Sequence, residues 1–339
     1  MAETSITIAI PSIGSGSLLA ACLDSLTRQS HSRFEVVVID NSGTGAIERE
    51  LEGKFPALSL RVLRSPRNVG FGAAVNRAFE TSTADYLATL NDDTEAAPGW
   101  LAAVAAQMQS APDVGMCASQ VRLLGKGTLD SAGMLIGLDG SSKQRGHGEP
   151  PEKFARPEDV LLPSACAALY RREMLEDVGL FDEDFFLYCE DTDLGLRGRR
   201  NGWRCRYAPE AVVQHHYSQS SGPASPLKAW YVERNRLWVA VKNFPRRALV
   251  FVPLHAKIRY GWHAWYMLRG QGSASRLPEG SGILELAGMA VRAHWSVITH
   301  LANLRRKRKA IRSTALLNER QFLRLLKENS ISDREIARL

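Results

Sequence analysis

Short β-branched runs alternate with amphipathic segments along the first 120 residues of the chain. The runs at 6–10 and 34–40 are apolar and end at turn residues, which is typical of strands in a sheet covered on both faces. Between them, leucine and cysteine recur at helical spacing from 17 to 29. Alternation of this length predicts βαβ units around a parallel sheet. We expect strands at 6–10, 34–40, 60–63, 86–90 and 114–118, and helices at 17–29, 72–81 and 99–109.

Polar side chains stand where three of these strands end. Pro11 and Ser12 follow the first strand, Asp40 closes the second, and Asn91-Asp92-Asp93 follows the fourth. In open α/β sheets ligands bind beyond the carboxyl ends of strands, so these residues should meet in one crevice. Beyond Ser119 the alternation weakens, and 137–159 is rich in Gly, Pro and charge. We expect an irregular loop there, able to close over a bound substrate.

Composition narrows the function classes. The 339 residues, 45% hydrophobic and 23% charged, suffice for an enzyme core with an appendage. The five cysteines are scattered without a Cys-x-x-Cys pair, which argues against a zinc cage and against a disulfide framework. The first residues show no basic leader before the apolar run, so we expect a cytosolic protein.

Common nucleotide-binding and hydrolase motifs are missing. Gly14 and Gly16 follow a strand, but the third glycine of the dinucleotide fingerprint would fall at Leu19. No Gly-x-x-x-x-Gly-Lys-Ser/Thr run and no Gly-x-Ser-x-Gly elbow occur. A nicotinamide enzyme, a P-loop enzyme and a serine hydrolase with a nucleophile elbow are therefore disfavoured.

An aromatic run at 185–188 is followed by Glu190, Asp191 and Asp193 at the start of a predicted helix. Carboxylates crowded beside apolar surface can have their proton affinities pushed apart, which acid/base chemistry on a hydroxyl group requires. The same acids would also suit a first helical turn, with Asp193 paired to Arg197. Both interpretations stay open on this segment alone.

Asn91-Asp92-Asp93 offers hard oxygen ligands to a divalent cation, which usually takes one or two protein carboxylates plus substrate phosphates. A turn or helix cap before Pro98 explains the same acids equally well. His215 closes the strand-like 211–214, where a lone histidine is more often structural. Asp93 and His215 are candidates for metal ligands only as a pair.

Taken in order, the motifs of the first two thirds of the chain resemble the inverting family 2 glycosyltransferases, and among them the bacterial rhamnosyltransferase-like and galactofuranosyltransferase-like branch. The resemblance rests on many separate segments, which makes it more specific than any one motif. They are Pro11, Asp40-Asn41-Ser42, Arg67 to Asn76, Asn91 to Thr94, Pro98 to Leu101, Gly179 to Glu183, Glu190 to Leu194, and Pro209-Glu210-Ala211 followed by His215.

The resemblance implies a GT-A fold, a Rossmann-like mostly parallel α/β sheet, with a helical C-terminal extension. It implies a catalytic domain over 1–225, with a nucleotide-binding half at 1–120 and an acceptor half at 121–225, and an extension over 226–339. It implies a nucleotide-diphosphate sugar as donor and Mg²⁺ or Mn²⁺ as cofactor. Acceptors would be a glycan or a polyprenyl-linked saccharide.

The resemblance also implies roles for individual residues. Asp191 takes the place of the general base, with Glu190 beside it, and Asp93 and His215 take the places of metal ligands. Trp203 is a candidate for stacking on an acceptor sugar, although packing explains it equally well. The expected nucleotide-sugar contacts are Pro11, Asp40, Arg67, Asn68, Gly70, Asn76 and Asp92.

Departures from the family pattern leave the metal dependence and the nucleotide selectivity open. Asn91 stands where many relatives have the first metal-motif Asp, so the dependence on metal is uncertain. Gly43-Thr44-Gly45 departs from the usual spacing after Asp40, which leaves the base selectivity open. Transfer of rhamnose from dTDP-rhamnose is the leading hypothesis, and galactosyl, galactofuranosyl or other hexosyl transfer from a UDP-sugar is the alternative.

The C-terminal third of the sequence predicts helices that lie on a membrane surface and do not cross the membrane. No run reaches the roughly 20 apolar residues that span a bilayer. In 283–304, Leu284, Val291, Trp295 and Ile298 share one helical face. With Trp262, Trp265, Tyr266 and the basic cluster at 305–312, this suggests helices lying on the cytoplasmic face of the inner membrane, and packing against protein is the alternative.

Two other function classes compete. A nucleotidyltransferase needs a Gly-rich loop with Lys or Arg after the first strand, and 14–19 carries neither cation. A non-catalytic membrane or nucleic-acid binding module would use the +7 net charge but leaves the motif set unexplained. We expect no nucleic-acid partner, and a homo-oligomer stays open.

Overall fold

The computed structural model describes residues 4–14, 16–216, 226–272 and 283–338. Their contacts divide the chain into two compact units. The first unit is drawn from Met1–Met134, Gln144–Arg199 and Trp203–Ser220, and the second from Leu135–Lys143, Arg200–Gly202 and Ser221–Leu339. The expected division of the first 225 residues into two halves remains a prediction.

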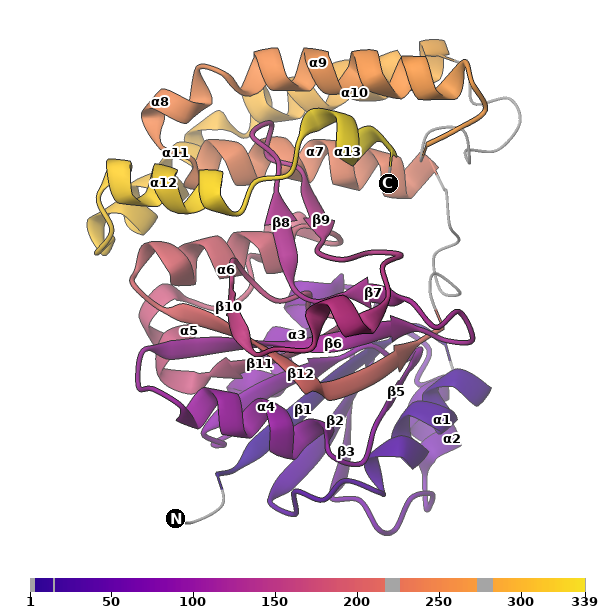
Figure 1. Ribbon diagram of the computed structural model, residues 1–339. Helices are drawn as coiled ribbons and strands as arrows, with labels where there is room; N and C mark the ends of the chain where they lie inside the picture. Colours follow the sequence, from indigo (N-terminus) through magenta and orange to yellow (C-terminus); the bar gives the residue numbers. More distant parts are fainter. Residues whose placement is uncertain (1–3, 15, 217–225, 273–282, 339) are drawn as a thin grey trace. The chain divides into compact units, whose positions relative to one another are not determined.

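A mixed sheet forms the centre of the first unit, in the order β10-β12-β6-β11-β4-β1-β2-β3 (Figure 1). Strands β3, β2, β1, β4, β6 and β12 run in one direction, and β11 lies antiparallel between β4 and β6. At its margins β5 pairs with β12 and β7 pairs with β6, while β8 and β9 form a separate two-stranded sheet. The strands of the described residues are β1 (Ile6–Ser12), β2 (Phe34–Asp40), β3 (Leu60–Arg64), β4 (Tyr86–Leu90), β5 (Thr94–Ala96), β6 (Val114–Leu123), β7 (Leu129–Ser131), β8 (Met134–Ile136), β9 (Ser142–Gln144), β10 (Glu158–Val160), β11 (Ala167–Arg171) and β12 (Arg204–His215).

Helices cover both faces of this sheet, because alternate strand residues point to opposite sides. Ile8 and Val38 belong to a core that includes helices α1, α2 and α4, whereas Ala9 and Val37 belong to a second core that includes α3, α5 and α6. These helices are α1 (Ser17–Leu26), α2 (Ala46–Leu51), α3 (Phe71–Glu80), α4 (Trp100–Gln109), α5 (Arg172–Val178) and α6 (Glu190–Arg200).

The expected parallel βαβ architecture is confirmed, and β2 and β4 have the expected bounds. The short helices α2 and α5 and the strands β5, β7, β8, β9, β10 and β11 were not foreseen. The segment 137–159 is more regular than the expected loop, because it contains β9, a 3₁₀ turn at Pro151–Phe154 and most of β10, which pairs with β12. Antiparallel pairing satisfies its backbone despite the glycines and prolines.

The second unit is mainly helical. Helix α7 packs against α10 and α11, and α9 packs against α13. The amphipathic segment expected at 283–304 is divided, because the helix ends at Thr299 and a new one begins at Leu301. The helices are α7 (Pro226–Asn243), α8 (Arg246–Leu249), α9 (Val252–Met267), α10 (Ile283–Thr299), α11 (Leu301–Ser313), α12 (Glu319–Glu328) and α13 (Asp333–Arg338).

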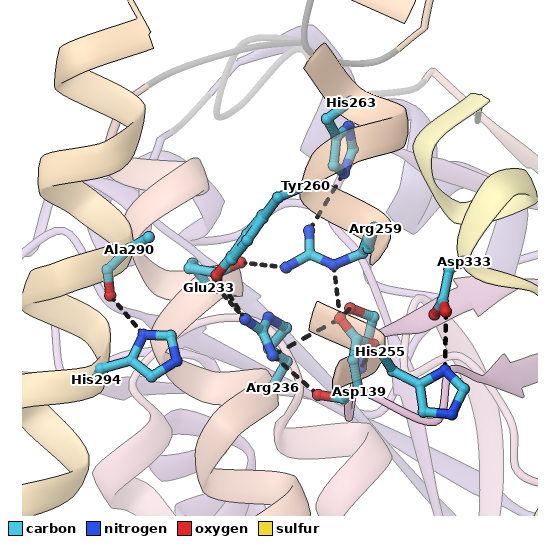
Figure 2. A network of polar contacts seen from close by, with 11 residues as sticks. Asp139, Glu233, Arg236, His255, Arg259, Tyr260, His263, Ala290, His294 and Asp333 are labelled. Atoms are coloured by element: carbon cyan, nitrogen blue, oxygen red, sulfur yellow. Dashed lines mark hydrogen bonds and ion pairs between the residues drawn. The ribbon is translucent and has the colours of Figure 1, made fainter. Parts of the chain in front are cut away.

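A buried network of charges ties this unit together (Figure 2). Arg259 of α9 pairs with Asp139 at 2.6 Å and with Glu233 of α7 at 2.8 Å. Arg236 of α7 pairs with Glu233 and donates to the carbonyl oxygen of Asp139 at 2.9 Å, and Tyr260 donates to Glu233. Because a buried charge is costly without a partner, each group fixes the position of the next.

Within the described residues, no helix has both the length and the apolar character needed to cross a membrane.

Candidate active site at the carboxyl edge of the sheet

Candidate residues from three strand ends meet at one edge of the first unit. The parallel register sets Ser12 beside Asp40, and β4 ends at Leu90, immediately before Asn91. The Ser12 hydroxyl donates to the carboxylate of Asp92. Burial raises the pKa of Asp92 to about 6; the hydrogen bond from Ser12 opposes this shift, and the charge of Asp93 adds to it. The edge is therefore polar and acidic, as the sequence predicted.

Asp93 and His215 lie side by side although 121 residues separate them in the chain. β12 pairs with β5 so that His215 stands opposite Thr94, and Nε2 of His215 lies 3.3 Å from Oδ1 of Asp93. Asp93 is only 3% exposed. Burial alone lowers the pKa of His215, but the adjacent Cys166 sulfur and the carboxylates of Asp130 and Asp93 outweigh it and raise the pKa.

These two side chains fit a divalent cation that is also held by substrate. Oδ1 of Asp93 is buried and accepts no hydrogen bond from the described residues. Nε2 of His215 and Oδ1 of Asp93 are a nitrogen and an oxygen donor 3.3 Å apart, and such a pair would suit two ligands of one divalent cation. Nowhere in the described residues do three or more His, Cys, Asp or Glu side chains form a group that could hold a metal ion. The pair therefore suits a cation whose remaining ligands are phosphate oxygens and water.

Asp130 and His147 lie directly behind His215. Oδ2 of Asp130 is 2.8 Å from Nδ1 of His215, and its Oδ1 is 3.1 Å from Nδ1 of His147. Sequence reasoning missed both residues. Asp130 lies in the three-residue strand β7, and His147 follows β9, in a region without periodic pattern. The pairing of β7 with β6 brings Asp130 to this edge, and backbone hydrogen bonds between residues 145–149 and 129–133 bring His147 beside it.

Glu190 and Asp191 begin α6 in contrasting environments. Asp191 accepts hydrogen bonds from the backbone of Ala165 at 3.2 Å and of Thr192 at 2.6 Å. Oε2 of Glu190 is buried and accepts none from the described residues. Burial, together with the charge of Asp191, raises the pKa of Glu190, and burial raises that of Asp191 against its hydrogen bonds.

The segment before α6 is strained. Phe186, Tyr188 and Cys189 have φ of 63°, 67° and 68°, a region that non-glycine residues rarely adopt. Such strain collects at functional sites and persists only where the surroundings enforce it. Here Phe71 at the start of α3 donates its backbone N–H to the carbonyl oxygen of Phe186 at 2.8 Å, and Gly70 packs against the same carbonyl.

Residues 165 and 166 connect the pair Glu190 and Asp191 with the strand end that carries Asp93. The carbonyl oxygen of Cys166, next to Ala165, accepts a hydrogen bond from the backbone N–H of Asn91 at 2.9 Å. Residues 165 and 166 therefore contact both the general-base candidate and the strand end that carries Asp93. The structure thus brings together Asp191, Glu190, Asp93 and His215, from separate stretches of the sequence.

The expected nucleotide-binding residues lie in the first half of the same unit. Arg67 and Asn68 are exposed. Asp40 is fully buried, and its carboxylate accepts hydrogen bonds from Ser42 and the backbone of Glu48. Burial raises the pKa of Asp40, but these hydrogen bonds outweigh it and lower the pKa overall.

Two further candidates differ in their surroundings. The side-chain amide of Asn76 exchanges two hydrogen bonds with the backbone of Phe181, at 2.9 and 3.0 Å. Pro11, in contrast, lies partly exposed in β1 beside Ile39. Nucleotide contact by any of these residues remains a prediction.

Trp203 does not join this group. Its indole N–H donates to Asp177 of α5 at 2.8 Å, and its ring packs over Gly115 near the start of β6. Trp203 precedes β12, whereas His215 ends it, so extended chain of at most roughly 40 Å, at about 3.3 Å per residue, lies between them. These contacts agree with the packing interpretation, and stacking on an acceptor sugar remains a prediction.

Comparison with known proteins agrees with the geometry. The family model described as Glycosyl transferase family 2 matches residues 7–179. A stretch of 239 residues is 30% identical to the N-acetylglucosaminyl-diphospho-decaprenol L-rhamnosyltransferase of Mycobacterium tuberculosis, covering 63% of this chain and 77% of that protein. Another of 229 residues is 31% identical to the uncharacterized protein y4gI of Sinorhizobium fredii, covering 64% of this chain and 25% of that longer protein.

Solved structures share the fold. GalNAc-T7 with UDP, GalNAc and Mn²⁺ aligns over 86% of this chain and 54% of its own, with a TM-score of 0.60 and 17% identity. TarS 1–349 of S. aureus in complex with UDP-GlcNAc aligns over 96% of this chain and 92% of its own, with a TM-score of 0.56 and 16% identity. The chain has the GT-A fold, and it belongs to glycosyl transferase family 2.

Proposed function

We propose that this glycosyltransferase moves a sugar, with inversion, from a nucleoside-diphosphate donor to a hydroxyl group of a lipid-linked saccharide in cell-surface polysaccharide synthesis. The donor we favour is dTDP-rhamnose, since the M. tuberculosis relative is named as an L-rhamnosyltransferase. The acceptor class is proposed from the decaprenyl diphosphate in the same name. Both assignments come from a relative at 30% identity over part of the chain.

The acid pair at the start of α6 is the observation that supports this proposal most directly. Two adjacent buried carboxyls cannot both ionise cheaply, so their environments decide which one holds the proton. Asp191 has hydrogen-bond donors that stabilise its anion, whereas Oε2 of Glu190 has none among the described residues. Glu190 is therefore the group that stays protonated, and Asp191 is the base.

In the proposed step, Asp191 accepts the proton of the acceptor hydroxyl as that oxygen bonds to the anomeric carbon. The bond from the anomeric carbon to the diphosphate oxygen breaks on the opposite face, and the nucleoside diphosphate leaves with the electron pair. Attack from the face opposite the leaving group inverts the anomeric centre. A positioned base of this kind contributes about 10²–10⁴-fold in rate.

Asp93 and His215 would hold a divalent cation on the leaving-group side. Such a cation neutralises the charge that develops on the departing diphosphate. Asp93 offers an unsatisfied buried oxygen, and His215 is held with Nε2 directed at it. The exposed Arg67 could add positive charge for the phosphates from the loop before α3.

A donor screen tests the reaction. The purified full chain is incubated with Mn²⁺ or Mg²⁺, a membrane extract that supplies acceptors, and dTDP-rhamnose, UDP-galactose, UDP-glucose, UDP-N-acetylglucosamine or GDP-mannose in turn. We expect release of nucleoside diphosphate from one donor, lost in Asp191→Asn and Asp93→Ala and on chelation with EDTA. Asp177→Asn, which alters an acid at the other end of the sheet, should retain full turnover. Unchanged turnover in Asp191→Asn would refute the assignment of the base.

We further propose that the second unit rests on the cytoplasmic surface of the membrane. Along α9 and just beyond it, Leu254, Ile258, Trp265 and Leu268 share one face and are 53%, 42%, 46% and 81% exposed. A contiguous exposed apolar face of this kind marks an interaction site. The segment 246–269 carries lysine and arginine but no Asp or Glu. That combination suits the surface of an anionic bilayer.

Helix α10 supports the same placement. Val291, Trp295 and Ile298 lie at helical spacing and are 68%, 63% and 61% exposed. They belong to the face predicted from the sequence; Leu284 of that prediction falls outside the described side chains.

Vesicle flotation tests the membrane proposal. We expect the full chain to float with phosphatidylglycerol vesicles and only weakly with phosphatidylcholine vesicles. The double variant Trp265→Ser and Leu268→Ser should bind at least about tenfold more weakly, because each apolar side chain contributes about 1.5–3 kcal/mol on burial. Leu316→Ser, at a 74% exposed leucine outside these helices, is the matched control. Equal flotation of all three proteins would contradict the proposed surface.

A further inference from the structure

A chain of alternating carboxylates and imidazoles extends inward from the proposed cation ligands. Asp93, His215, Asp130 and His147 follow one another at contacts of 3.3, 2.8 and 3.1 Å. Asp130 is 3% exposed, and its two carboxylate oxygens face different histidines.

We propose that Asp130 is a positioning residue for cation binding: it fixes the ring orientation and the tautomer of His215, and His147 in turn holds Asp130. This inference rests on the proposed function, because it assigns His215 as a cation ligand.

The geometry of the two contacts carries the inference. A carboxylate can only accept a hydrogen bond, so Nδ1 of His215 must carry the proton that lies between it and Oδ2 of Asp130. Nε2, the other ring nitrogen, lies 3.3 Å from Oδ1 of Asp93, so a cation bound there would replace its proton and take both atoms as ligands. A half-turn of the ring would break the contact with Asp130. Outer partners of this type orient ligating histidines and raise their basicity.

His147 completes the arrangement. Its Nδ1 lies 3.1 Å from Oδ1 of Asp130 and 3.2 Å from the backbone oxygen of the same residue. With Oδ1 facing His147 and Oδ2 facing His215, the carboxylate of Asp130 cannot rotate without losing a partner. The backbone supports this too, since Leu129 and Ser131 on either side of Asp130 pair with β6.

A purely structural role explains the buried acid poorly. Burying a carboxylate costs free energy, and an apolar residue at this position of a short edge strand would avoid that cost. The buried carboxylate of Asp130 holds His215 in one tautomer, and this role accounts for its presence.

The neighbouring residues provide an internal control. His216 pairs with Glu95 at 2.9 Å, so a second histidine and carboxylate stand next in the chain. Neither side chain takes part in the contacts from Asp93 to His147. Glu95→Gln therefore perturbs a comparable pair outside the proposed positioning chain.

The experiment measures binding of Mn²⁺ by the full chain, in the presence of dTDP, from the loss of the free-ion signal in electron paramagnetic resonance. We expect Asp130→Ala to weaken binding about 10–100-fold, as loss of an outer partner does at other metal sites. Asp130→Asn keeps the volume and guards against misfolding, and it should weaken binding less. His147→Gln should have a smaller effect still, and Glu95→Gln none.

The second readout uses Mg²⁺, which is diamagnetic, in place of Mn²⁺. With Mg²⁺ and dTDP bound, nitrogen-15 shifts of the His215 ring should show Nδ1 protonated and Nε2 without a proton in the wild type, and a loss of this preference in Asp130→Ala. Wild-type binding that persists unchanged in Asp130→Ala, with an unchanged tautomer, would overturn this inference and leave the proposed function intact. Absence of Mn²⁺ binding in the wild type would overturn the proposed cation site and the inference with it.

Discussion

Gly70→Ala tests whether the loop before α3 holds the catalytic segment in place. Gly70 has a φ of 87°, and a Cβ at this position would lie 2.2 Å from the carbonyl oxygen of Phe186. The atom it meets is backbone, so no side-chain rotation can relieve the contact. Phe186 lies four residues before Glu190, in the strained segment that leads into the acid pair.

The magnitude follows from the geometry. Ordinary contact begins at 3.4 Å, so the carbonyl of Phe186 must retreat by about 1.2 Å. With a φ of 87° and a ψ of 174°, Gly70 lies in a region that essentially only glycine adopts, and holding an alanine there costs about 1–3 kcal/mol. Loss of the hydrogen bond from Phe71 adds about 0.5–1.5 kcal/mol. Misplacement of a catalytic group by about 1 Å can lower the rate about 100-fold. We therefore expect a stability loss of about 2–4 kcal/mol and a loss of turnover of about 100-fold.

The assay compares urea unfolding and donor turnover for Gly70→Ala and Gly53→Ala. Gly53 has a φ of 70°, but no atom lies within 4 Å of the place that an alanine Cβ would take, so it shares the positive φ without the clash. We expect Gly53→Ala to lose about 1–2 kcal/mol and to keep its turnover. If Gly70→Ala keeps kcat within twofold of the wild type, the segment is not positioned by this contact, and the reasoning fails.

Three further outcomes follow from the acid pair and its helix. The raised pKa of Asp191 predicts that kcat/KM falls with decreasing pH through a value above the ordinary carboxyl pKa of about 4, and a pH-rate profile with a limb below 4 would contradict this. The folded-state pKa of Glu190 is raised, so its contribution to stability is fully present below the ordinary pKa of about 4.3 and is lost as pH rises through the folded-state pKa. Glu190→Gln should therefore make the free energy of unfolding depend less on pH over that window, as measured by urea unfolding. Arg197 contacts Asp193 at 2.9 Å and the carbonyl oxygens of residues 178–180, so Arg197→Met should cost about 3–5 kcal/mol in urea unfolding, against less than about 0.5 kcal/mol for the exposed Arg28→Met.

Much of the site could be predicted because its chemistry stands in short local motifs. The strand ends at Asp40 and Asn91 were visible as β-branched runs followed by polar residues, and parallel strands bring such ends to one edge. The two explanations offered for the acids at 190–193 concern different residues. Asp193 pairs with Arg197, as the helix-start explanation predicted, while Glu190 and Asp191 are buried with raised pKa and their acid/base role remains a prediction. One turn of helix can accommodate both because its side chains point in different directions.

The rest was decided by tertiary structure. The hydrophobic period and the composition determined the α/β class and the positions of the parallel strands β1, β2, β3, β4 and β6, since buried strands and amphipathic helices depend on local patterning. The contact of Asp93 with His215 needed the pairing of β5 with β12, and the place of Asp130 needed the pairing of β7 with β6. Such pairings join residues far apart in the chain through backbone hydrogen bonds, which every residue type offers alike. Trp203 shows the converse, because its sequence position beside motif residues carried no information about its contact with Asp177 before the start of β12.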